Sequence, residues 1–294
     1  QKTVRDVETR LLALAAVPND VAISTLLLRS HLENHHVAGY CSDSWLSEAK
    51  GIHDGERCYL LGCGPCLSTL DPELLSGHVI MGVNGTAKHK GLRLDYFMTV
   101  GDVWWKQNRD ILDTDLCEVR RFLPPFVQQD DSRWPTSRIR VTTSYEAKAT
   151  GKATPMAFSH DVSRLVHLGG TVIFPALQVL HHLGFSEVIL LGVDHDYAQD
   201  MNLDNHGFVS SEELNHFDPD YYDQPTPIHC DVLGMERGYA LADEVFRQSG
   251  RIIMNATPDS RLDIFQRVDL AGLCACPVRS RTESAASQLD GGTT

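Results

Sequence analysis

The stretch Arg57-Cys-Tyr-Leu-Leu-Gly-Cys-Gly-Pro-Cys66 decides the fold class of this chain. Its first five residues form a short apolar run, which is typical of a buried parallel strand, and the glycines that follow predict a tight turn. Residues 68–75 then supply polar caps and a proline suited to a helix start. A glycine turn that joins a strand to a helix can hold an anion, so residues 62–66 are predicted to bind a nucleotide.

The same alternation of strand and helix continues along the chain. Apolar runs predict further strands at residues 79–84, 96–102, 138–142, 186–194 and 251–256. Helical patterns are predicted for residues 172–184, which end in a glycine, for residues 234–249, and for a segment that begins at Trp104 and Trp105. This order predicts an α/β fold, Rossmann-like, with a mostly parallel sheet and helices on both faces.

Three regions are expected along the chain. Residues 1–50 form a helical N-terminal segment, because helix formers fill residues 5–17 and 21–34. Residues 51–275 are predicted to form the Rossmann-like catalytic domain. Residues 276–294 are rich in Ser, Thr and Gly and are expected to be disordered.

Composition limits the possible partners. The 294 residues carry a formal net charge of −13 and no dense basic run, which argues against nucleic-acid binding. No apolar stretch reaches the roughly 18 residues of a membrane span, and the first residues lack the order of a signal peptide. We therefore expect a cytoplasmic protein without a transmembrane segment; peripheral membrane association and a homo-oligomer both stay open.

Polar residues end several of the predicted strands. Asn84, Asp102 and Asp194 each follow an apolar run, as the glycine turn does. In open parallel sheets, ligands bind in the crevice beyond the carboxyl ends of the strands. We therefore expect these side chains and the turn to converge on one site.

The turn itself has three interpretations. Cys63-Gly-Pro-Cys66 spells the thioredoxin redox motif, and a thiol at a helix N-terminus can have a lowered pKa. Leu-Gly precedes it where thioredoxins carry an aromatic residue. A phosphate-binding turn and a purely structural turn are the other two interpretations. The eight cysteines lack the spacing of a disulfide scaffold, and no metal site is expected among them.

Several motifs in register resemble one superfamily. The turn from Gly62 onward is similar to the Gly-Asn-Gly-Pro-Ser-Leu turn of bacterial family 42 sialyltransferases, and equally to the family around archaeal 6-hydroxymethylpterin pyrophosphokinase. Further matches over about residues 55–270 are Val83-Asn84, Tyr96-Phe-Met-Thr-Val-Gly-Asp102, Gly169-Gly-Thr171 with Gly184-Phe185, Leu191-Gly-Val-Asp194, Asn215-His-Phe-Asp-Pro-Asp-Tyr221 and Asn255-Ala-Thr257.

This resemblance implies donor-binding roles for several positions. They are Gly62, Gly64 and Pro65, which shape the turn; Asn84, which contacts the nucleotide's sugar or phosphate; Gly170 and Thr171, which contact the phosphate or reacting sugar; and Asp194, which contacts the ribose or base. Cys63 and Cys66 depart from the family, which has Asn and Ser there. Because a thiol is a poorer hydrogen-bond partner, their side-chain contacts to the nucleotide are in question.

Transfer of a sugar with inversion needs a base for the acceptor hydroxyl and a group that stabilises the departing phosphate. The sialyltransferases carry their base histidine between the last motif strand and the next helix. By distance to that helix His229 fits best, and by local motif His216 does; His206 lies in the same segment. Tyr221 and Tyr222 are candidates to donate to the phosphate.

Asp194-His-Asp196 spells the D-x-D that binds a metal–nucleotide complex in another glycosyltransferase fold. Family 42 enzymes use a CMP-sugar, which has one phosphate, and need no metal. A pyrophosphokinase would need Mg²⁺ for ATP, with Asp102, Asp194 and Asp196 as candidate ligands. Asp196 is therefore kept among the nucleotide-site candidates.

The resemblance as a whole implies a metal-independent glycosyltransferase of surface polysaccharide synthesis. It would transfer an acidic sugar, of the sialic acid, other nonulosonic acid or Kdo type, from a CMP-sugar to a glycan or glycoprotein acceptor. The alternatives are a Mg²⁺-dependent 6-hydroxymethylpterin pyrophosphokinase and a non-catalytic nucleotide-binding module of a glycan-synthesis protein.

Overall fold

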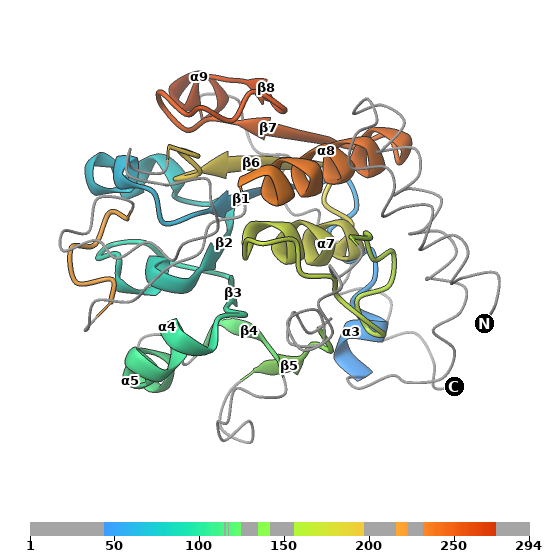
Figure 1. The fold of residues 1–294 in the computed structure, drawn as a ribbon, viewed down its shortest axis with the longest axis horizontal. Coiled ribbons are helices and arrows are strands. Elements are labelled where there is room, and N and C mark those ends of the chain that lie inside the picture. Colours follow the sequence, from blue (N-terminus) through green and yellow to red (C-terminus); the bar gives the residue numbers. More distant parts are fainter. Residues whose placement is uncertain are drawn as a thin grey trace, which may run out of the picture.

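The computed structural model describes residues 44–114, 116, 118–124, 135–141, 156–196, 216–222 and 232–274. Within these ranges, eight strands form one sheet in which every pairing is parallel (Figure 1). The strands are β1 (Arg57–Leu61), β2 (Val79–Val83), β3 (Tyr96–Met98), β4 (Arg120–Leu123), β5 (Thr136–Arg138), β6 (Glu187–Leu191), β7 (Ile252–Asn255) and β8 (Gln266–Arg267). The predicted α/β class and parallel sheet are confirmed.

The order of the strands creates a reversal beside β1. The sheet runs β5-β4-β3-β2-β1-β6-β7-β8, so the chain first moves outward from β1 to β5 and then returns to the other side of β1. Figure 1 shows β5 and β8 at opposite ends of the sheet. Leu61 of β1 stands opposite Gly82 on one side and Leu191 on the other. The carboxyl ends of β1 and β6 therefore form the switch point where open α/β sheets bind ligands.

Alternate side chains of β1 pack in two separate apolar cores, one on each face of the sheet. Cys58 and Leu60 pack in the core that lies under helices α7 (Ile173–Leu183) and α8 (Val232–Gln248), which lie side by side in Figure 1. Tyr59 and Leu61 pack in the core on the other face. That face is covered by 3-10 helices η2 (Pro65–Thr69) and η3 (Pro72–Leu75) and by helices α4 (Asp102–Gln107) and α9 (Leu270–Cys274). Helices therefore lie on both faces, as predicted.

Helix α7 ends where the sequence predicts. Gly184 has φ 102°, in the left-handed region, and a Cβ there would lie 2.8 Å from Gly51 Cα, so both conformation and space favour glycine. Inside the helix, the fully buried Gln178 Oε1 accepts hydrogen bonds from the amides of Ser159 and His167. These hydrogen bonds hold the preceding loop against α7 at residues 159 and 167.

Several elements differ from the sequence-based expectation. Residues 68–75 form no α-helix, because Asp71 accepts a hydrogen bond from Glu73 N and Pro72 starts a new 3-10 turn. The strand predicted at 138–142 overlaps β5 only at Arg138, where β5 ends; Val141 makes one isolated bridge to Val166. β3 ends at Met98, short of the predicted residue 102.

Five short elements were not predicted at all. They are β4, β8, α5 (Arg109–Thr114), α9 and the 3-10 helix η4 (Asn84–Lys88). Of the predicted N-terminal helical segment, the structure describes only the end, as helix α3 (Ser44–Glu48), whose Leu46 is fully buried in the α7 core. Residues 1–43 and 275–294 lie outside the described residues. In the described part, no helix combines the length and apolar character that crossing a bilayer requires.

Candidate functional site

The turn after β1 packs directly on the end of β6. Gly62 N donates to Leu191 O over 2.7 Å, and Gly64 N donates to Gly192 O over 2.8 Å. A Cβ at Gly62 would lie 2.3 Å from Gly192 O, which explains the glycine there. These two N–H groups are occupied by β6, so a bound anion must be held by other groups of the turn.

Asp194 closes the other side of this turn. Its carboxylate lies so near Gly64 that a Cβ on that residue would come 1.4 Å from Oδ2. Cys66 Sγ donates to the same oxygen over 3.9 Å, and Arg261 N donates to the Asp194 carbonyl over 2.8 Å. Burial raises the pKa of Asp194 above its ordinary value. The predicted turn and the predicted strand-end carboxylate are thus in direct contact.

Asn84 begins η4 at the carboxyl end of β2, with φ 44°. Its side chain hydrogen-bonds the hydroxyl of Tyr221. Its Oδ1 atom is buried and accepts no hydrogen bond from the residues that the structure describes. A left-handed asparagine with a buried acceptor that lacks a partner is an unusual arrangement, and it marks this position as a candidate for ligand contact.

Residues 216–222 lie over the turn. Phe217 N donates to Cys63 O over 2.9 Å. Tyr221 is 2% exposed and packs on Gly85, where a Cβ would lie 2.5 Å from the Tyr221 ring. The His216 ring stacks on Tyr221, with centroids 3.6 Å apart and planes 5° apart. Tyr222 meets Tyr221 edge-on at 4.8 Å. This segment brings three of the predicted residues to the turn and Asn84.

The two cysteines of the turn are free thiols. Cys63 Sγ donates to Val83 O over 3.1 Å. Burial raises the pKa of both Cys63 and Cys66 to about 12, and the charge of Asp194 contributes at Cys66. Redox-active thiols in C-x-x-C motifs need a lowered pKa, so this environment argues against the thioredoxin-like interpretation. Burial also raises the pKa of Tyr221 well above its ordinary value, which keeps its hydroxyl protonated.

Gly170 and Thr171 lie at the start of α7. Gly170 has φ 78°, and Thr171 Oγ1 accepts a hydrogen bond from Ile173 N over 3.3 Å. Thr171 also hydrogen-bonds the hydroxyl of Tyr239 on α8. The His195 ring meets Tyr239 edge-on at 5.9 Å. These contacts connect residues 170–171 to the loop that carries Asp194.

His195, Glu236 and Tyr239 were not anticipated from the sequence. His195 has φ 53° and a side chain that is only 4% exposed, and its Nε2 lies 3.4 Å from Glu236 Oε1. A single histidine in a sequence does not reveal that its backbone will be left-handed or that its side chain will be buried. Its place between two aspartates was the available signal.

The two aspartates of the D-x-D sequence do not face a common position where a metal ion could bind. Asp196 Oδ1 lies 3.1 Å from Arg261 Nη1, while Asp194 faces Gly64 and Cys66. Among the residues described, no three His, Cys, Asp or Glu side chains are grouped as a metal site would require. His206 and His229 lie outside the described residues, and Asp102 is described only as the first residue of α4.

Two of the hollows lined by described residues lie at the ends of the strands. One, of about 560 Å³, lies beyond β7 and β8, between residues 255–260 and 267–270. It adjoins the candidate site, since Val193 N donates to Thr257 Oγ1 over 3.2 Å. Polar groups that surround this hollow include Asp259 and Arg267.

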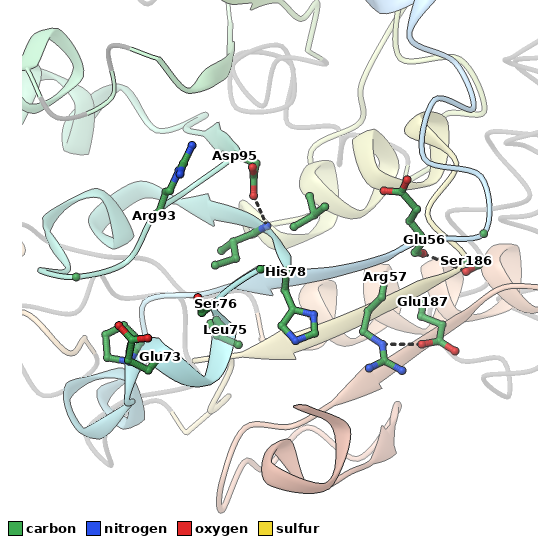
Figure 2. Close-up of a pocket in the computed structure, with 16 residues that line it drawn as sticks. Glu56, Arg57, Glu73, Leu75, Ser76, His78, Arg93, Asp95, Ser186 and Glu187 are labelled. Atoms are coloured by element: carbon green, nitrogen blue, oxygen red, sulfur yellow. Dashed lines mark hydrogen bonds and ion pairs between the residues drawn. The ribbon is translucent and has the colours of Figure 1, made fainter. Parts of the chain in front are cut away.

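The other hollow, of about 1170 Å³, lies at the amino ends of the strands (Figure 2). There Arg57 Nε donates to Glu187 Oε2 over 2.7 Å, and Asp95 Oδ2 accepts from Ile80 N over 2.9 Å. Its charged side chains thus connect the strand starts to one another. This edge is opposite to the switch point, so we place the candidate site at the carboxyl edge.

No protein-family model matches the sequence, and no curated protein matches it. Among solved structures, the fold is similar to that of the sialyltransferase CstII from Campylobacter jejuni, which was studied in complex with the substrate analogue cytidine-5'-monophosphate. The match covers 74% of this chain and 87% of that chain, with 10% sequence identity and a TM-score of 0.44. The matched protein is of the class that the sequence motifs resemble, and the likeness concerns the fold alone.

Proposed function

We propose that this chain is a glycosyltransferase that takes an acidic sugar, of the sialic acid, other nonulosonic acid or Kdo type, from a CMP-sugar donor. Asn84 carries the proposal, because its buried Oδ1 has no hydrogen-bond partner among the described residues and it lies next to the glycine turn. An amide oxygen accepts hydrogen bonds, and at neutral pH a phosphate diester has no proton to donate. Oδ1 therefore suits a ribose hydroxyl better than the phosphate.

The transfer step requires a general base for the acceptor hydroxyl and an uncharged group that donates a hydrogen bond to the departing phosphate. The base takes the proton of the acceptor hydroxyl, the acceptor oxygen bonds to the anomeric carbon, and the bond from that carbon to the phosphate oxygen breaks, so that CMP leaves with the electron pair. We assign the base to His216 or His229. Tyr222, which is half-buried, is the more accessible of the two tyrosines that could donate to the phosphate. Tyr221 is buried and hydrogen-bonded to Asn84, so we assign it the role of orienting the Asn84 side chain.

The carboxylates of the site support a donor with a single phosphate. Mg²⁺ that holds a triphosphate is bound through ionised carboxylates. The Asp194 carboxylate faces Gly64 and Cys66, and Asp196 is paired with Arg261. These surroundings favour the CMP-sugar over the pyrophosphokinase alternative, in which Asp194 and Asp196 would bind the metal together with Asp102.

Thermal shift with CMP, CDP, UDP, GDP and ATP, each with and without Mg²⁺, tests the proposal. Stabilisation by CMP that does not depend on metal is the expected result. Stabilisation by ATP only with Mg²⁺ would instead support a pyrophosphokinase. If no nucleotide raises the melting temperature, the nucleotide site itself is wrong.

A second measurement separates a transferase from a non-catalytic binding module. The protein is incubated with CMP-linked acidic sugars and a panel of glycan acceptors, and released CMP is quantified. Release that depends on the acceptor is expected for the transferase. CMP binding without any release under these conditions would favour the binding module.

A further inference from the structure

Lys88 connects the candidate nucleotide site to residues 216–222. Its Nζ lies 3.0 Å from Asp218 Oδ2 and donates to Asp220 O over 2.6 Å. Asp218 Oδ1 in turn accepts a hydrogen bond from Asp220 N over 2.9 Å. One ammonium group therefore holds both a carboxylate and a carbonyl of the same tight turn.

Burial distinguishes this ion pair from an ordinary surface pair. The side chains of Lys88 and Asp218 are 18% and 15% exposed. Fully exposed pairs contribute little to stability, since water and salt screen them. A largely buried pair is screened much less, and the removal of one partner leaves the other charge buried without compensation. The ion pair between Lys88 and Asp218 can therefore fix the position of the turn at residues 218–220.

The position of Lys88 in the chain joins this contact to the nucleotide site. Lys88 is the last residue of η4, whose first residue is Asn84. Gly85, between them, is the surface on which Tyr221 packs. A single 3-10 helix of five residues therefore carries the proposed ribose contact at one end and the anchor for residues 216–222 at the other.

Residues 216–222 hold His216 through this anchor. The ring of His216 stacks on Tyr221 at 3.6 Å, and Tyr221 directly follows Asp220, whose carbonyl Lys88 binds. On the other side, Phe217 N donates to Cys63 O, and the Phe217 ring lies 5.5 Å from the ring of His89. The stacking of His216 on Tyr221 thus depends on the turn that Lys88 binds, and the contact of Phe217 with Cys63 attaches the same segment to the glycine turn.

We infer that Lys88 is a positioning residue: its ion pair with Asp218 holds residues 216–222 against the glycine turn and so places His216 at the reacting centre. This inference rests on the proposed function, with His216 as the base. It assigns Lys88 no contact with the donor. Loss of the pair is therefore expected to slow the transfer step without weakening nucleotide binding.

The test compares Lys88→Met, Lys88→Arg and the control Lys90→Met. Lys90 is exposed and two residues away, so its replacement changes the charge equally without removing this pair. We expect Lys88→Met to lower kcat by about 10- to 100-fold, since a misplacement of about 1 Å can cost on the order of 100-fold. The Kd for CMP is expected to change less than about threefold. Lys88→Arg should recover most of kcat, because a guanidinium can bind the same carboxylate.

A hydrogen-exchange measurement, which needs no substrate, keeps this inference separate from the proposed function. Hydrogen exchange of the peptide that contains residues 216–222 is compared in the native protein, Lys88→Met and Lys90→Met. Faster exchange in Lys88→Met alone supports the anchor, even if no CMP-sugar is consumed by the native protein. A native protein that consumes no CMP-sugar would instead contradict the proposed function.

Two results would overturn the inference. One is unchanged exchange of residues 216–222 in Lys88→Met. The other is an active native enzyme in which Lys88→Met retains kcat, or in which kcat and CMP affinity fall in parallel with the melting temperature. The last pattern would mean that Lys88 contributes to general stability and does not position His216.

Discussion

Gly64 and Asp194 compete for the same space at the switch point of the sheet. A Cβ added to Gly64 would lie 1.4 Å from Asp194 Oδ2 and 2.9 Å from Gly192 O. Because Gly64 has no side chain, the carboxylate of Asp194 can approach the turn after β1. The glycine serves the approach of another strand end, in addition to any approach of a ligand.

Gly64→Ala is expected to displace the Asp194 carboxylate. Overpacking of this kind costs about 1–3 kcal/mol, so we expect a lower melting temperature and an affinity for CMP at least about tenfold weaker. Calorimetric titration and thermal unfolding measure the two effects. In the double variant Gly64→Ala/Asp194→Ala, the stability loss should be smaller than the sum of the single losses. Strict additivity would mean that the two residues do not interfere, and Gly272→Ala on α9 serves as the control.

Asn84→Gly and Asn84→Ala separate the backbone of this residue from its side chain. Both variants remove the Oδ1 acceptor, so both should lose CMP affinity. Only alanine is strained at φ 44°, and we expect Asn84→Ala to be less stable than Asn84→Gly by about 1 kcal/mol. Urea unfolding and CMP titration check this pair. Retention of full CMP affinity in both variants would remove Asn84 from the site.

The stability of the protein should depend on pH through Asp194. Burial raises the pKa of this carboxyl above its ordinary value of 3.8, so the folded state binds its proton more tightly than the unfolded state. Its contribution is then most favourable at low pH and falls as pH rises from 3.8 through the folded pKa. Asp194→Asn removes this penalty. We expect a higher melting temperature than that of the native protein at pH 7, and a smaller difference at pH 3.5.

The control for this measurement is Asp54→Asn. The side chain of Asp54 is 80% exposed, and it lies 3.7 Å from an arginine nitrogen. Because this carboxylate is exposed, the melting temperature of Asp54→Asn should differ little from that of the native protein at either pH. A melting temperature of Asp194→Asn below the native one at pH 7 would contradict the prediction.

The thiols of the turn should react slowly. A pKa of about 12 in place of 9 lowers the thiolate fraction on the order of 1000-fold, and the greater nucleophilicity of a more basic thiolate recovers about 30-fold of that. Alkylation of Cys63 and Cys66 by iodoacetamide at pH 8 is therefore expected to be at least about 30-fold slower in the native protein than in urea. Peptide mass spectrometry resolves the sites. Rapid labelling, or a disulfide formed under mild oxidation, would restore the redox interpretation.

His216→Ala and His229→Ala test the proposed base. Loss of a general base costs about 10²- to 10⁴-fold in rate, and CMP binding should persist in the variant that lacks the base. His216→Phe can keep the stacking on Tyr221 without a nitrogen that accepts a proton. If His216 is the base, this variant should be as inactive as His216→Ala. His78→Ala, at the opposite edge of the sheet, is the control, and full activity in both His216 and His229 variants would exclude them.

The sequence predicts the central part of the sheet well. β1, β2, β6 and β7 are short apolar runs, and burial on both faces makes such runs recognisable. β4 could not be predicted from the sequence, because it begins with two arginines and so lacks an apolar run. Arg121 is nevertheless fully buried, with Nη2 donating to Thr136 Oγ1 over 3.0 Å and the backbone paired to β5. Such compensation depends on a partner strand that no local pattern reveals.

The candidate site divides in the same way. The rule for parallel sheets places the glycine turn and Asp194 together, and the contact between Gly64 and Asp194 agrees with it. The sequence could not show that the amides of Gly62 and Gly64 would be taken by β6. It also gave no sign of Lys88, because a lysine two residues from another lysine is typical of a solvated surface. Its significance comes from Asp218, which is 130 positions further along the chain.

The contact between β1 and β6 also has a consequence for the order of folding. During synthesis the glycine turn is complete long before β6 exists, because about 125 residues separate Leu61 from its partner strand. Contacts so distant in sequence form slowly, since a long loop must first be closed. The turn therefore takes its final form only after β6 has paired with β1. A nucleotide that binds there selects for chains in which this pairing has formed, and its binding would report on that step of folding.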